Sequence, residues 1–60
     1  MIRLTTRHNE ELVLNPHRIE SIKRIPREVG ATITMLSGSR HEVLETVDQV
    51  HQRIEDLRHV

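Results

Sequence analysis

The Asn15-Pro16 pair interrupts an apolar run and limits what the first half of the chain can form. Asn is a preferred helix N-cap and Pro fits the first helical position, so at least one helical turn is expected from Pro16. The next isoleucines are three residues apart, which is a helical spacing: Ile19, Ile22 and Ile25. A helix over them would end at Pro26 after about ten residues. The alternative is one turn followed by a strand over residues 20–25, and the residues alone leave both open.

Alternating apolar and polar residues predict strands elsewhere in the chain. The segments with this pattern, or with a short apolar run that returns after a turn, are 1–6, 12–14, 31–36 and 40–45. Asn9 is the expected centre of the first turn. Gly38, which can adopt positive φ, is the expected centre of a tight turn over residues 37–39. Pro and Gly at the ends of residues 26–30 predict a connection.

The last part of the chain has the pattern of an amphipathic helix. Thr46 is a good N-cap and Gln49 follows three residues later, which completes a capping box. One apolar stripe follows with spacing three, four, three: Val47, Val50, Ile54 and Leu57. The predicted fold is therefore α+β, with about five short antiparallel strands in a bent or barrel-like sheet and one C-terminal helix. The predicted core is Ile2, Leu4, Leu12, Leu14, Ile22, Ile33, Met35, Val43, Val50, Ile54 and Leu57.

The composition limits the size of this core. Sixty residues allow a single small domain, here residues 1–60, and the chain has no Phe, Tyr, Trp or Cys. Small domains without such stabilising features often oligomerise, so we expect self-association. The candidate interface is the end of the helix stripe, Ile54, Leu57 and Val60. Nine basic and nine acidic residues give zero net charge, which argues against nucleic acid or an anionic membrane as the dominant partner.

Several segments, in order along the chain, resemble the FlbD family of small flagellar proteins, which includes the SwrD swarming proteins. They are "MIRLT", "LVLNP", "IESI", "TITMLSG" and "VLETVDQV". The positions that match the family motifs are Asn15, Pro16, Ile19, Glu20, Ile22, Gly38, Val43, Glu45, Thr46 and Val50. The resemblance also implies a strand, not a helix, after Asn15-Pro16.

The resemblance implies a role in bacterial flagellar motility. Family members are small cytoplasmic proteins thought to support the motor through its stator, and they are not known as enzymes. The expected protein is thus a non-enzymatic accessory that acts through protein–protein contacts with motor or stator components. Its expected location is the cytoplasm, with the membrane-proximal flagellar base as the candidate place. No apolar run approaches the ~20 residues of a membrane span, so no membrane insertion is expected.

Other functions find little support in the residues. No Cys, Gly-x-Ser-x-Gly elbow or Gly-rich phosphate loop is present, so we expect no catalytic residue and no cofactor. No two histidines have the i,i+4 spacing of a zinc-binding helix, so no metal is expected. A small RNA-binding regulator is the alternative function, because basic residues gather at residues 18–27. Acidic residues interleave with them, however, and no aromatic side chain can stack on bases.

Overall fold

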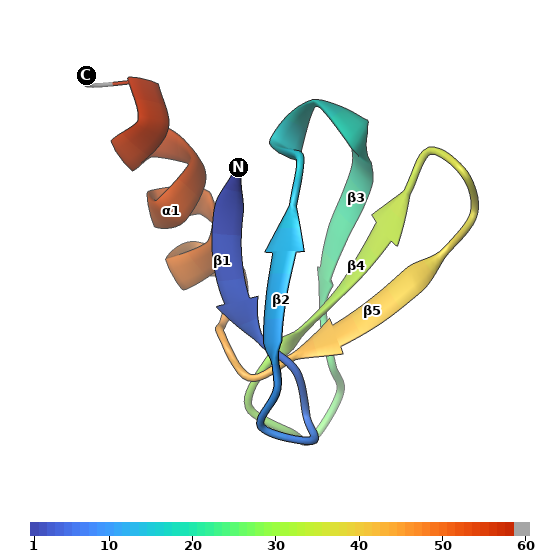
Figure 1. Cartoon of the computed structure of the whole chain (residues 1–60). Helices are drawn as coiled ribbons and strands as arrows, with labels where there is room; N and C mark the ends of the chain where they lie inside the picture. Colours follow the sequence, from blue (N-terminus) through green and yellow to red (C-terminus); the bar gives the residue numbers. More distant parts are fainter. Residues whose placement is uncertain (59–60) are drawn as a thin grey trace.

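The computed structural model describes residues 1–58 and has the predicted α+β fold (Figure 1). The elements are β1 (Ile2–Thr5), β2 (Glu11–Leu14), the single-turn 3-10 helix η1 (Pro16–Arg18), β3 (Ile19–Arg24), β4 (Ala31–Met35), β5 (Arg40–Val43) and α1 (Val47–Arg58). All strand pairs are antiparallel and form two sheets, β1-β2 and β3-β4-β5. The sheets are open rather than closed, so the arrangement is the bent form of the prediction and not a barrel.

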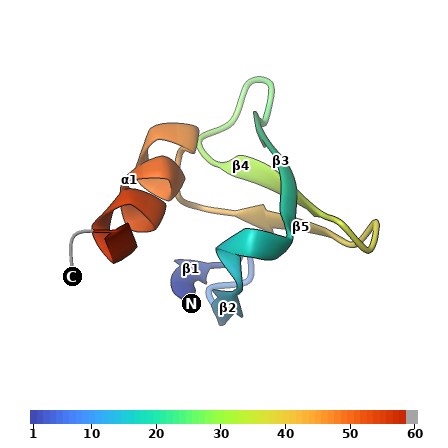
Figure 2. The ribbon, with the colours of Figure 1, turned by 90° about the horizontal axis from the view of Figure 1, so that it is seen from above.

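The two sheets meet at one junction. Thr6 forms an isolated bridge with Val43, and the Leu44 N–H donates to the Thr5 carbonyl oxygen at 2.8 Å. The sheets diverge from this point, and α1 packs against β1 and β3. Seen from above, the β1–β2 hairpin, the three-stranded sheet and the helix surround the core from three directions (Figure 2).

The segment after Asn15 forms a turn and then a strand, as the family resemblance implied. The Asn15 side chain accepts a hydrogen bond from the His17 N–H at 3.0 Å, and Pro16 occupies the first turn of η1. A β-bulge then lies between Ile19 and Ser21. Because the bulge adds one residue, Ile19 and Ile22 both face the core side of β3 although they are three positions apart. The continuous helix over residues 16–25 is therefore wrong, and the bulge explains its apparent spacing.

The predicted turns and helix start are confirmed. Asn9 and Gly38 both have positive φ, 61° and 96°. Thr46 and Gln49 exchange the two hydrogen bonds of a capping box, at 2.9 and 3.2 Å. The last strand is shorter than predicted. It ends at Val43 because residues 44–45 leave β5 and bind β1 instead.

The core is smaller than predicted and lies between the two sheets and α1. Seven predicted residues are buried: Ile2, Leu4, Leu14, Ile33, Met35, Val43 and Val50. Three more are only half-buried: Leu12, Ile22 and Ile54. Leu57 is 41% exposed, so its place in the predicted core is wrong. The strands are short, and the last turn of α1 extends past the start of β1 (Figure 1). Ile25 and Ala31 are buried although the prediction omitted them.

Candidate functional site

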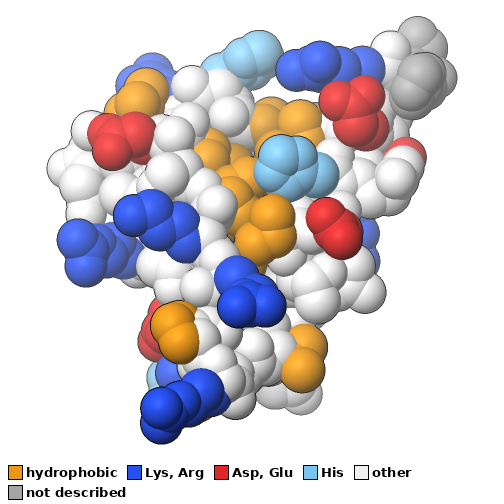
Figure 3. All heavy atoms as spheres, turned by 180° about the vertical axis from the view of Figure 1, so that it is seen from behind, with side chains coloured by type: hydrophobic (Ala, Val, Ile, Leu, Met, Phe, Trp, Pro, Cys, Tyr) orange, Lys and Arg blue, Asp and Glu red, His pale blue; other side chains and the backbone are white. Residues whose placement is uncertain are grey.

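A groove runs between β3 and α1, on the face opposite to that of Figure 1. Its volume is about 390 Å³. The residues that line it, here called the β3–α1 groove, are Pro16, Ile19, Glu20, Ser21, Ile22, His51, Ile54, Glu55 and Arg58. Figure 3 shows hydrophobic side chains gathered at the centre of this face, with charged side chains and histidines around them. The groove therefore has an apolar floor and a polar rim.

The groove unites residues that lie far apart in the sequence. Four matched family positions line it: Pro16, Ile19, Glu20 and Ile22. The candidate interface residue Ile54 faces them from α1. Leu57 does not line the groove but is exposed near its end on the last turn of α1. Val60 lies outside the described residues.

The helix side of the groove holds residues that the sequence analysis did not single out. They are His51, Glu55 and Arg58, and Arg58 lies 3.7 Å from Glu55 in an exposed ion pair. Together with Ile54 they have the spacing three, one, three, which places them on one helix face. That spacing was a signal in the sequence, but nothing in it showed which element the face would meet.

The remaining family positions stabilise the fold. Asn15 caps η1 and Thr46 caps α1, as described above. Gly38 lies in the β4–β5 turn, where positive φ favours glycine. Val43 and Val50 are fully buried in the core. These positions therefore have structural roles in the fold. Of the ten matched positions, the β3–α1 groove gathers four on one surface.

Glu45 has a specific structural role that sequence alone did not show. Its Oε1 accepts a hydrogen bond from the Thr5 N–H at 2.9 Å, across 40 positions of sequence. The N–H and C=O groups of Thr5 point away from β2. The N–H donates to Glu45, and the C=O accepts a hydrogen bond from the Leu44 N–H, so both groups have a partner. Glu45 thus fixes β1 to the start of α1.

Replacing Glu45 tests this contact. We expect Glu45→Ala to destabilise the protein by about 1 to 2 kcal/mol, because the part-buried Thr5 N–H loses its acceptor. Glu45→Gln keeps an oxygen acceptor and should retain most of the stability. The control is Glu42→Ala, which removes only an exposed ion pair worth less than about 1 kcal/mol. Urea denaturation followed by circular dichroism measures all three, and equal losses for the two alanine variants would contradict the assignment.

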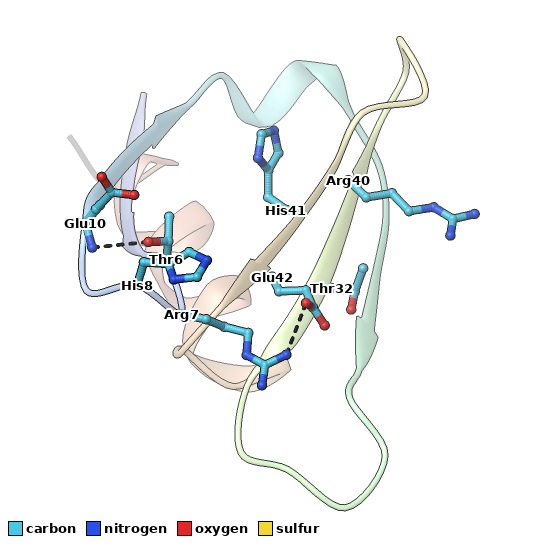
Figure 4. Close-up of a pocket in the computed structure, with 8 residues that line it drawn as sticks. All are labelled: Thr6, Arg7, His8, Glu10, Thr32, Arg40, His41 and Glu42. Carbon is cyan, nitrogen blue, oxygen red and sulfur yellow. Dashed lines mark hydrogen bonds and ion pairs between the residues drawn. The ribbon is translucent and has the colours of Figure 1, made fainter.

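A second, polar groove lies between the β1–β2 turn and the three-stranded sheet (Figure 4). Arg7 dominates it and bonds Glu42 of β5 and Glu28 of the 25–30 connection, each at 3.2 Å. His8 and His41 project from different elements, and Arg40 points away from the other residues (Figure 4). Because two carboxylates already bind the Arg7 guanidinium, this side chain holds the β1–β2 turn, β5 and the 25–30 connection together.

Within residues 1–58, no group of three or more His, Asp or Glu side chains is placed to hold a metal ion. No helix in the described part of the chain is long and apolar enough to cross a membrane.

The fold and groove together define a small α+β domain with an open apolar surface beside an edge strand. The chain belongs to the FlbD family of flagellar and swarming motility proteins, whose family model matches residues 1–60. The family predicted from the sequence is thereby confirmed, and family membership implies a role in flagellar or swarming motility. No curated protein and no solved structure matches the chain.

Proposed function

We propose that the protein is a non-enzymatic accessory of flagellar motility that binds motor or stator components through the β3–α1 groove. The observation that carries the proposal is the groove itself. It gathers matched family residues and the helix residue Ile54 around an apolar floor that its own fold leaves half-exposed. Apolar surface rimmed by polar side chains is typical of protein-binding sites.

The chemistry of the groove favours binding over catalysis. The potential nucleophile in it is Ser21, and the potential general base is His51 on the opposite wall. Both lie on an open surface, where preorganised charges are weakened by water. A surface that binds another protein needs no such preorganisation, because the burial of apolar area supplies the binding free energy.

A motility assay tests the proposal. In a motile strain that lacks the gene, we expect the wild-type chain to restore movement and Ile54→Gln to restore less than half of it, because the groove floor becomes polar. Val13→Gln is the matched control, since Val13 is an exposed apolar residue on β2 outside the groove. Circular dichroism should confirm that both variants fold.

Filament number separates this function from gene regulation. A motor accessory leaves filaments present and weakens movement, whereas an RNA-binding regulator changes filament number. Full movement with Ile54→Gln, or equal loss with Val13→Gln, would overturn the groove as the contact site. Normal movement in the deletion strain would overturn the motility role.

A further inference from the structure

A further pocket lies between the end of η1 and the β4–β5 turn. Its volume is about 380 Å³, which is within the range of sites for small ligands. The residues that line it, here called the η1–turn pocket, are Arg18, Met35, Leu36, Ser37, Ser39 and His41. None of them lines the β3–α1 groove. The two surfaces are therefore separate, and a ligand of the pocket is independent of the proposed motor contact.

Backbone hydrogen bonds fix the two walls of this pocket relative to each other. The Leu36 N–H donates to the Arg18 carbonyl oxygen at 2.8 Å, so the last residue of η1 is held against the turn. Within the turn, the Met35 N–H donates to the Ser39 carbonyl oxygen and the Gly38 N–H to the Met35 carbonyl oxygen. Because the backbone is already fixed, a ligand loses less free energy to the ordering of the pocket.

The polar side chains of the pocket offer hydrogen-bond donors from three elements. The Arg18 guanidinium forms no ion pair within residues 1–58. Figure 4 shows the half-buried His41 side chain pointing from β5 toward η1, where its ring N–H can donate. The Ser39 hydroxyl accepts a hydrogen bond from the Ser37 hydroxyl at 3.2 Å, so its own hydrogen remains free to donate.

The charge of the pocket distinguishes it from the other hollows of the described chain. No acidic residue lines it, whereas at least one lines each of four other pockets in residues 1–58. Its surroundings are also positive, since residues 16–43 carry five basic and three acidic residues. Two of these acidic residues, Glu28 and Glu42, already bind Arg7. A local excess of positive charge attracts anions, so the pocket favours an anionic ligand.

We propose that the η1–turn pocket binds a phosphate group carried by a molecule with an apolar part. The planar guanidinium of Arg18 can bind two phosphate oxygens at once, and His41 and Ser39 can donate to the remaining oxygens. The apolar part contacts Leu36, which is 58% exposed at the pocket, and the buried Met35 beneath it. A soluble phosphomonoester and the headgroup of a phospholipid share this chemistry.

A titration with phenyl phosphate, followed by two-dimensional NMR of the 15N-labelled chain, tests the pocket. We expect saturable shifts of the backbone amide signals of residues 37–41, with a Kd in the millimolar range. Inorganic phosphate should bind at least about twofold more weakly, because it lacks the apolar part. Arg18→Gln should raise the Kd for phenyl phosphate at least about fivefold and Ser39→Ala about threefold. Both side chains are exposed, so both variants should fold, as circular dichroism can verify.

The control is Arg27→Gln, which removes the same charge at the opposite end of the three-stranded sheet (Figure 1). It should change the Kd less than about twofold, because solvent and salt screen charges at that separation. Shifts that do not saturate, or an equal loss of affinity with Arg27→Gln, would show general attraction to a basic surface and overturn the site.

Co-sedimentation with vesicles identifies the source of the phosphate. The vesicles contain phosphatidylcholine with or without phosphatidic acid. If the chain binds only the vesicles with phosphatidic acid and Arg18→Gln abolishes this binding, the ligand is a lipid headgroup. If phenyl phosphate binds and neither kind of vesicle does, the ligand is a soluble phosphomonoester. Both results support the pocket as a phosphate site.

Discussion

Gly30→Ala is expected to lower the stability of the protein by about 3 kcal/mol or more. Gly30 is buried and has φ of 129°, a conformation that residues with a Cβ rarely adopt. A methyl group there would also overlap the carbonyl oxygen of Val43, which is backbone and cannot rotate away. A domain of this size has a total stability of roughly 3 to 9 kcal/mol, so the variant should be largely unfolded or close to it.

Gly38→Ala is the matched control, because it separates the two causes. Gly38 also has positive φ, but a Cβ there would meet no atom within 4 Å. We expect a loss of about 1 to 2 kcal/mol from the backbone conformation alone. Thermal denaturation at one fixed protein concentration measures both variants, since any dimer makes the melting temperature depend on concentration. Equal shifts in melting temperature would show that the contact with Val43 is unimportant.

Ile33→Ala should have the second large effect, a loss of about 2 to 5 kcal/mol. Ile33 is fully buried at the centre of β4, the middle strand of its sheet, between Ile22 and His41. Removing most of its side chain leaves a cavity that neighbours on both strands cannot fill without breaking their pairing. The core has no aromatic residue to compensate, so each buried aliphatic side chain carries a large share of the stability.

Leu36→Ala provides the comparison for Ile33→Ala. Leu36 follows β4 directly and is 58% exposed, so its truncation should cost less than about 0.5 kcal/mol. Urea denaturation followed by circular dichroism gives both free energies of unfolding. A loss below about 1 kcal/mol for Ile33→Ala would mean that the sheets do not enclose the core as described.

Most elements of the fold could be predicted because their causes are local. A strand alternation, a positive-φ residue at Asn9 and the Thr46–Gln49 capping box each depend on a few neighbouring residues. The helix over residues 16–25 was a real alternative for the same reason. The spacing of Ile19 and Ile22 is helical on its own, and the bulge that explains it exists only when β4 is paired with β3.

The candidate site was only partly predictable. The matched residues of β3 and the helix residue Ile54 were identified separately, one set by family resemblance and the other by the apolar stripe. Their union in one groove depends on how α1 docks against the sheets, which no short segment encodes. The sequence analysis missed the polar helix residues of the groove, His51, Glu55 and Arg58. They share one helix face, but the sequence does not show which element that face meets.

The sequence by itself determined the turn at Asn15-Pro16, the strands outside residues 20–25 and the start of α1, since these follow from interactions within a few residues. Only the tertiary structure decided which apolar residues are enclosed. Ile25 and Ala31 are buried in it, whereas Leu57 is exposed. Leu57 is exposed because α1 is longer than the strands and its last turn extends past them. The tertiary structure also decided that Glu45 bonds Thr5 and that β3, within residues 1–58, is an edge strand of its sheet. Contacts of this kind join segments up to 50 positions apart, and their geometry exists only after the chain has folded.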